Sequence, residues 1–240
     1  KLNSGDKWIQ GGILIAENKG LTEGQTISKS TPPNLLNSSI EVFEKCALGI
    51  DEDLERMKFN WRTRTLTEGE RSAWAEIGVF INGPIERIHV APGATIRDCS
   101  LNTESGDIVL GKDSEIMEGS RIRGPFVLGP KSQIKMGSVV YGPTTIGASC
   151  KVGGEISNSV IHDYSNKAHE GFLGNSVIGL WCNLGAMTTS SNLKNNYSNI
   201  KVWDESKKDY TNSGRVFCGL LMGDHSKTAI NTKFYRICST

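Results

Sequence analysis

The sequence of 240 residues has no excess of either charge, few aromatic residues and no long apolar segment. Its 27 Lys and Arg residues nearly balance its 26 Asp and Glu residues, so charge gives no reason to expect a nucleic acid or an anionic membrane as partner. No apolar stretch approaches the roughly 20 residues that a membrane span needs, and no signal peptide is recognisable. We therefore expect a cytoplasmic protein that acts on small molecules.

Paired cysteine motifs are also missing. The six cysteines are scattered, and none forms a CxxC pair: Cys46, Cys99, Cys150, Cys182, Cys218 and Cys238. This spacing predicts reduced thiols and argues against both a disulfide framework and a zinc knuckle. Aromatic residues make up only 7% of the chain, whereas glycine occurs 27 times. That composition favours a fold with many tight corners and an aliphatic core.

Residues 1–75 show no repeat. The apolar stretch at 11–16 is compatible with a single strand, Thr31-Pro32-Pro33 breaks regular structure, and residues 35–59 are compatible with a helix although Gly49 weakens it. We expect a short mixed α/β segment here, and none of its residues points to a particular chemistry.

From Leu110 onward an aliphatic residue recurs at every sixth position. The members of this column are Leu110, Ile116, Ile122, Leu128, Ile134, Val140, Ile146 and Val152. A second and mostly small column follows four residues after each of them: Ser114, Ser120, Phe126, Ser132, Ser138, Thr144, Cys150 and Ile156. Neither an α-helix nor an alternating strand has this period, whereas hexapeptide repeats of a parallel β-helix do.

In such a helix, each hexapeptide forms one short strand and a turn, and three of them close a triangular coil. Both columns point inward, and stability comes from stacking because one repeat cannot bury its apolar face alone. Val90 and Ile96 look like an earlier start of the pattern, before an insertion at 102–107, and Phe172, Ile178 and Leu184 resume it. The pattern is interrupted at 158–170 and again at 190–212. The second interruption is rich in Asn, Ser and Lys and is expected to protrude as a functional loop.

Both interruptions contain motifs that resemble a known family. They read SNKAHEGFLGNSVIG at 165–179, NLGA at 183–186 and NLKNNY at 192–197, with supporting matches at 142–147, 151–155 and 222–227. Over residues 76–234 the chain resembles the acetyltransferase half of the bifunctional glucosamine-1-phosphate N-acetyltransferase/N-acetylglucosamine-1-phosphate uridyltransferase family, in its variant bacterial and archaeal type. The resemblance implies an all-β fold, a left-handed parallel β-helix. It also implies a homotrimer with active sites between subunits, acetyl-CoA as acyl donor, and a place in UDP-N-acetylglucosamine synthesis.

The same resemblance assigns roles to individual residues. His169 matches the general base, which suits an imidazole because its ordinary pKa of about 6.5 leaves it largely neutral near pH 7. The backbone N–H of Ala186 would face the thioester oxygen and Asn183 would hold the sugar. Glu155 and Phe172 fall in the acceptor site, and Asn196 and Lys201 match the loop that reaches the sugar phosphate. No metal is expected.

Simpler interpretations exist for most of these residues. His169 is also explained as a surface side chain at a corner, Asn183 as a partner of a corner backbone group, and Glu155 as an outward-facing charge. Asn196 and Lys201 are equally expected in any solvated loop, and their match to the family requires an insertion of about four residues.

Three departures from the family concern the acceptor. Phe172 replaces a tyrosine, Ser157 replaces a lysine, and the phosphate-binding arginine has no clear counterpart, with Arg123, Lys135 and Lys151 as candidates. These changes bear on which amino sugar is accepted more than on acyl transfer itself.

The expected domains are a connector or remnant of an upstream nucleotidyltransferase domain at 1–75, the β-helix at 76–234 and a tail at 235–240. No Gly-rich phosphate loop is present, so we expect no uridylyl transfer by this chain. Family members continue for several coils beyond residue 232, so part of the coenzyme A groove is expected to be missing.

Two other functions fit the repeat. A β-helix kept only as a trimerising scaffold of a nucleotidyltransferase would show the same period. A zinc hydratase of the γ-carbonic-anhydrase type also uses this helix, with three histidine ligands, for which His162, His169 and His225 are available.

Overall fold

The structure is a computed structural model that describes residues 7–10, 13–17, 26–29, 36–204 and 206–235. The chain divides into two compact units, Lys1–Asn37 and Ser38–Thr240. The first unit holds a three-stranded sheet in the order β2-β1-β3, formed by β1 (Lys7–Gln10), β2 (Ile13–Glu17) and β3 (Thr26–Lys29). The strand expected at 11–16 is found as β2, while Gly11 and Gly12 lie outside the described residues.

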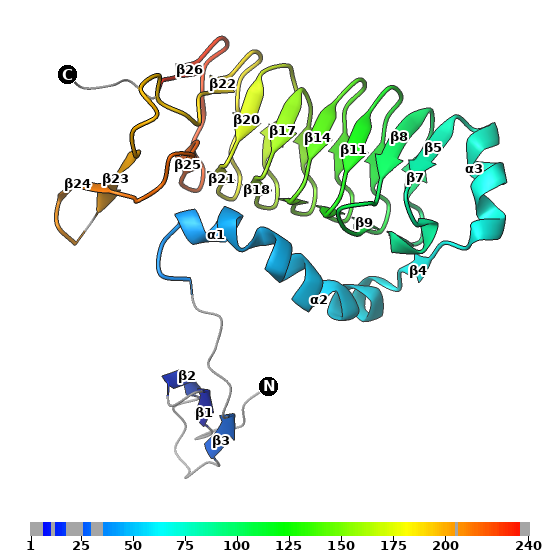
Figure 1. The fold of residues 1–240 in the computed structure, drawn as a ribbon, viewed down its shortest axis with the longest axis horizontal. Helices are drawn as coiled ribbons and strands as arrows, with labels where there is room; N and C mark the ends of the chain where they lie inside the picture. Colours follow the sequence, from blue (N-terminus) through cyan, green and yellow to red (C-terminus); the bar gives the residue numbers. More distant parts are fainter. Residues whose placement is uncertain (1–6, 11–12, 18–25, 30–35, 205, 236–240) are drawn as a thin grey trace. The chain divides into compact units, whose positions relative to one another are not determined.

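The second unit is a parallel β-solenoid with three sheets (Figure 1). Sheet 1 contains β7 (Thr95–Ile96), β10 (Glu115–Ile116), β13 (Gln133–Ile134), β16 (Lys151–Val152) and β19 (Asn166–Lys167). Sheet 2 contains β5 (Val79–Asn82), β8 (Cys99–Asn102), β11 (Arg121–Arg123), β14 (Val139–Tyr141), β17 (Glu155–Ser157), β20 (Phe172–Gly174), β22 (Thr189–Ser190) and β26 (Lys233–Phe234).

Sheet 3 contains β6 (Ile88–Val90), β9 (Ile108–Leu110), β12 (Phe126–Leu128), β15 (Thr144–Ile146), β18 (Val160–Ile161), β21 (Val177–Ile178) and β25 (Leu221–Met222). A short strand, β4 (Arg64–Thr65), adds to β6 in antiparallel orientation. All other pairings in the three sheets are parallel, so the predicted parallel β-helix is confirmed and its left hand stays a prediction.

The two predicted columns form the core. Every aliphatic member from Leu110 to Val152 is at most 2% exposed, and so is every member of the second column from Ser114 to Ile156. Four of the inner hydroxyls donate to nearby carbonyls, as when Ser132 Oγ donates to Gly147 O over 2.6 Å, whereas the buried Ser114 Oγ has no partner among the described residues. Stacked burial of this kind contributes about 25 cal/mol per Å² of apolar surface.

Beyond Val152 the coils become shorter than eighteen residues, and two predicted positions shift. Ile156 pairs with Val140 and so belongs to the aliphatic column, not to the second column as predicted. The segment at 158–170 interrupts the period, yet the chain keeps coiling through β18 and β19. Leu173 pairs with Ile156 and is 1% exposed, while Phe172 pairs with Glu155 on the outer face. The prediction that Phe172 resumes the inner column was therefore wrong by one residue. The reason is that residues lost at the corners change the spacing while the inward stacking is kept.

The predicted helical segment covers one face of the solenoid. It forms α1 (Ile40–Glu44) and α2 (Cys46–Trp61), which lie along sheet 3 in Figure 1. Phe43 and Ile50 are buried, and they pack with outward valines of sheet 3, among them Val109, Val127, Val160 and Val177. The outer face of sheet 3 is thus a second apolar layer covered by the chain itself.

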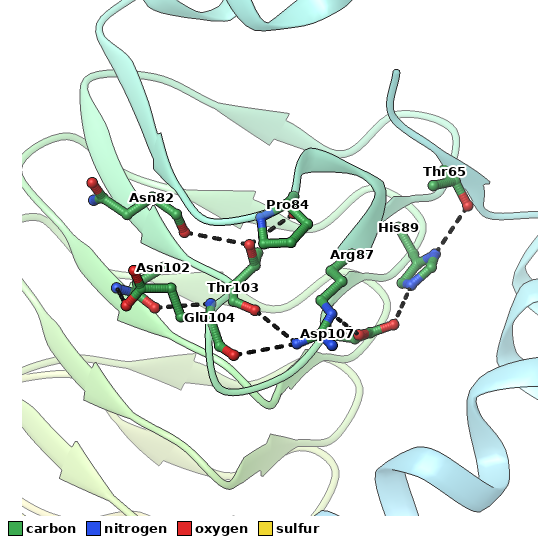
Figure 2. Close-up of polar contacts among 9 residues, drawn as sticks. All are labelled: Thr65, Asn82, Pro84, Arg87, His89, Asn102, Thr103, Glu104 and Asp107. Atoms are coloured by element: carbon green, nitrogen blue, oxygen red, sulfur yellow. Dashed lines mark hydrogen bonds and ion pairs between the residues drawn. The ribbon is translucent and has the colours of Figure 1, made fainter. Parts of the chain in front are cut away.

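The predicted insertion at 102–107 connects β8 to β9 and is fixed by polar contacts (Figure 2). The buried His89 lies 2.7 Å from Asp107 through Nε2 and 3.3 Å from Thr65 Oγ1 through Nδ1. These contacts tie the insertion and β4 to the first coils. The N-terminal end also carries η1 (Glu68–Glu70), α3 (Arg71–Glu76) and η2 (Ile85–Arg87).

The loop predicted at 190–212 is also present. Residues 191–220 leave the solenoid after β22 and return at β25, and they carry a hairpin of β23 (Lys201–Asp204) and β24 (Asp209–Asn212). Ile200 and Cys218 anchor this excursion against Ile40 and Phe43, and Arg215 forms an ion pair with Glu44.

Two further expectations concern the whole chain. The five described cysteines are buried free thiols, as expected, and Cys238 lies outside the described residues. No helix in the described ranges combines the length and the apolar character that crossing a bilayer requires.

Candidate active site

His169 and Ala186 occupy the same corner of two successive coils. This corner joins sheet 1 to sheet 2. Asn166 pairs with Asn183 before the corner and Leu173 with Ser190 after it, and both pairs are 17 residues apart. His169 and Ala186, also 17 residues apart, are therefore equivalent positions, about 4.8 Å apart along the solenoid axis.

The groups at this corner are available for a ligand. The imidazole of His169 is exposed. The carbonyl of Ala186 accepts a hydrogen bond from Asn231 N, but its N–H donates none to the described residues. An accessible imidazole and a free backbone donor on adjacent coils are the two groups that acyl transfer to an amine requires.

Beside the corner, Glu155 and Phe172 lie side by side on the outer face of sheet 2. Glu155 is exposed and Phe172 is half-buried. The Phe172 ring lies over Gly174, where an added Cβ would come within 2.4 Å of a ring atom. The glycine thus allows the ring to lie against the sheet as one wall of the site.

The structure adds Asn192 to this wall. Its Nδ2 donates to Asn175 Oδ1 over 2.7 Å, and it lies beside Gly174 and the Phe172 ring. Asn192 follows Ala186 by six residues, so aligning the sequence without any insertion would have pointed to it rather than to Asn196.

Asn183 lies on the outer face of sheet 1, between Asn166 and Lys227. It is exposed, and its side chain makes no hydrogen bond within the described part of the chain. Its amide is therefore not needed to satisfy a corner backbone group, which leaves it free for a ligand.

Asn196 and Lys201 are on the excursion, between sheet 2 and sheet 3, and both are exposed. Asn196 Oδ1 accepts from Ser198 N over 3.1 Å. Ile200, next to Lys201, packs with Val177 on the outer face of sheet 3, so Lys201 is held away from the corner of sheets 1 and 2 that carries His169.

The three candidates for the phosphate-binding cation are also separated. Arg123 lies on the outer face of sheet 2 in a hollow of about 240 Å³ that Asn102 and Tyr141 also line. Lys135 lies at the His169 corner two coils earlier, and Lys151 is on the outer face of sheet 1. Ser157, at the family's lysine position, pairs with Gly174.

One cation next to His169 is buried. Lys167 is 2% exposed, and burial lowers the pKa of its amine from 10.5 to about 8, with Glu170 acting in the opposite direction. Among the described residues, no group of three His, Cys, Asp or Glu side chains is close enough to hold a metal ion, so His162, His169 and His225 do not form a zinc site within one chain.

Parts of the chain are similar to bifunctional enzymes of sugar-nucleotide synthesis. It is 34% identical over 128 residues to a bifunctional sugar-1-phosphate nucleotidylyltransferase/acetyltransferase from Sulfurisphaera tokodaii, across 52% of this chain and 31% of that protein. It is 35% identical over 80 residues to the bifunctional protein GlmU of Methanococcus aeolicus and to that of Methanocaldococcus jannaschii, across 33% of this chain and 19% of each.

These relatives agree with the family that the motifs indicate. The chain spans less than a third of the length of these relatives. No protein-family model matches it.

Proposed function

We propose that this chain transfers an acetyl group from acetyl-CoA to the amine of an amino-sugar 1-phosphate, with glucosamine 1-phosphate as the preferred acceptor. The observation that carries the proposal is the stacking of His169 and Ala186 at one corner, next to the Glu155–Phe172 face. The name of the relative from Sulfurisphaera tokodaii, a bifunctional sugar-1-phosphate nucleotidylyltransferase/acetyltransferase, supports the substrate class.

In this proposal His169 accepts the proton that the amine loses as its nitrogen attacks the thioester carbonyl. The Ala186 N–H donates to the oxygen that becomes negatively charged, and the thiolate of coenzyme A leaves when the tetrahedral intermediate collapses. Glu155 and Phe172 line the acceptor site, and Asn183 binds sugar hydroxyls.

The proposal includes a homotrimer with sites between subunits. Lys201 lies on the sheet 3 side of its own chain, so in this proposal Lys201 and Asn196, on the same excursion, reach the sugar phosphate at His169 of a neighbouring copy. The domain organisation is part of the same proposal: residues 1–75 connect to, or derive from, a nucleotidyltransferase domain, and α1 and α2 within them pack on the solenoid.

A thiol-release assay tests this function. Acetyl-CoA is incubated with glucosamine 1-phosphate, galactosamine 1-phosphate or unphosphorylated glucosamine, and free coenzyme A is measured. We expect turnover with the phosphorylated sugars and a loss of at least about 100-fold in His169→Ala.

His162→Ala is the matched control, because His162 is exposed at a different corner, and it should keep its rate. Absence of turnover with every acceptor would favour a non-catalytic scaffold. Turnover at an unchanged rate in His169→Ala would instead contradict the role of His169 as the general base.

A further inference from the structure

Lys167 occupies a position that is aliphatic in the neighbouring coils. The inner column of sheet 1 consists of Ile96, Ile116, Ile134, Val152, Lys167 and Leu184. Lys167 stacks between Val152 and Leu184 and is only 2% exposed. Placing an amine there costs free energy of desolvation, so the position calls for a specific role.

The amine makes two hydrogen bonds at the corner that holds His169. Lys167 Nζ donates to the carbonyl of Gly153 over 2.9 Å and to the carbonyl of His169 over 2.5 Å. These carbonyls belong to successive coils, so one amine fixes the corner from inside the solenoid.

Earlier coils use hydroxyl groups for the same purpose. Ser120 Oγ and Ser138 Oγ both donate to Lys135 O at this corner. The next two equivalent positions are Gly154 and Gly171, which carry no hydroxyl.

Side chains are excluded at these two positions. Both glycines have positive φ, +77° and +124°, and a Cβ on Gly171 would lie 2.1 Å from Thr188 O. The His169 corner therefore lacks the donors that stabilise earlier corners, and the Lys167 amine replaces them.

We propose that Lys167 is a positioning residue that holds the His169 corner in the conformation needed for acetyl transfer. The effect on catalysis rests on the proposed function, in which His169 is the general base. Lys167 does not touch the substrate and acts through the His169 backbone, so its loss displaces the imidazole relative to the Ala186 N–H.

Lys167→Met tests the proposal because it keeps most of the side-chain volume and removes both donors. We expect kcat to fall by about 10- to 100-fold with little change in the KM for acetyl-CoA, since misplacing a catalytic group by about 1 Å has an effect of this size. Lys167→Gln, which keeps an N–H donor, should recover part of the loss. Leu184→Met, in the same column one coil later, is the control and should keep wild-type kcat.

A second readout does not depend on turnover. Each variant is followed by two-dimensional NMR of the histidine ring C–H groups, with His169 assigned from His169→Ala. Lys167→Met should shift or broaden the His169 signal and leave that of His162 unchanged.

An unchanged His169 signal in folded Lys167→Met, or a wild-type kcat, overturns the proposal. A shifted signal in a chain without turnover would instead uphold the positioning role and reject the proposed reaction. If Lys167→Met does not fold, the same comparisons are made with Lys167→Gln.

Discussion

A lysine inside an aliphatic stack makes the stability of this chain depend on pH. The pKa of the Lys167 amine is lowered to about 8 in the fold, against 10.5 when it is unburied. Between these values the unfolded chain binds a proton that the folded chain has released. The free energy of unfolding therefore rises with pH between these two values. The stability gained in this way is lost again as the pH falls through 8.

Lys167→Met should remove this dependence. We expect wild-type stability to rise relative to the variant between pH 8 and pH 10, by at most roughly 3 kcal/mol. Urea denaturation of both proteins across this range measures the difference. Parallel profiles would show that the folded and unfolded states titrate alike at this position.

The glycine at the His169 corner gives a second test at this scale. Gly171→Ala should destabilise the fold by several kcal/mol, because its Cβ would collide with Thr188 O in addition to the strain of positive φ. Gly137→Ala is the matched control: φ is +70° there, but nothing lies within 4 Å, so about 1 kcal/mol is expected. Thermal unfolding measures the stability that each variant loses. Equal losses of stability in Gly171→Ala and Gly137→Ala would contradict the predicted collision with Thr188 O.

At the level of elements, the helices α1 and α2 join the excursion to the solenoid. Phe43 is 1% exposed and packs with Ile40, Ile200 and Cys218, so one side chain links α1 to the excursion. The apolar outer face of sheet 3 depends on this cover, unlike the outer faces of the other two sheets.

Phe43→Ala should therefore lower the free energy of unfolding by about 3–5 kcal/mol and speed proteolysis of the excursion. Leu48→Ala, at a position 44% exposed, should change stability by less than about 1 kcal/mol. Chemical denaturation and limited proteolysis check both expectations. Unaltered cleavage in Phe43→Ala would mean that α1 does not hold the excursion.

The inward-facing residues of the regular coils could be predicted from the sequence, whereas those of the shortened coils could not. From Leu110 to Val152 each side has six residues, so period alone predicts which side chains are inside. After Val152 the corners lose residues, and only the stacking registers show that Leu173 points inward and Phe172 outward.

Two residues of the candidate site, Lys167 and Asn192, were not predicted from the sequence, because their roles depend on contacts between coils. A search for aliphatic residues overlooks Lys167, since its role depends on hydrogen bonds to backbone carbonyls. Asn192 was missed because a match to Asn196 was preferred, although only the coil geometry shows which amide lies beside Phe172. The motifs named His169 and Ala186, and the stacking registers show that they share one corner, while their roles in catalysis stay a prediction.

For the whole molecule, the separation of His169 from Lys201 makes assembly part of the proposed chemistry. We expect sedimentation to give three times the 26.1 kDa mass of one chain. We also expect His169→Ala and Lys201→Ala subunits, each inactive alone, to recover activity when co-expressed with different tags and purified as mixed trimers. Each mixed trimer then contains a site built from the intact part of two chains. A monomer, or mixed assemblies without activity, would contradict a site between subunits.

Mass spectrometry of the product tests the proposed reaction most directly. With [¹³C]acetyl-CoA and glucosamine 1-phosphate, we expect wild-type protein to form a sugar phosphate labelled with acetyl on nitrogen, in equal amount to the coenzyme A released. His169→Ala should form about 100-fold less, and His162→Ala as much as wild type. Labelled product from His169→Ala at the wild-type rate, or none from the wild-type protein, would contradict acetyl transfer at this corner.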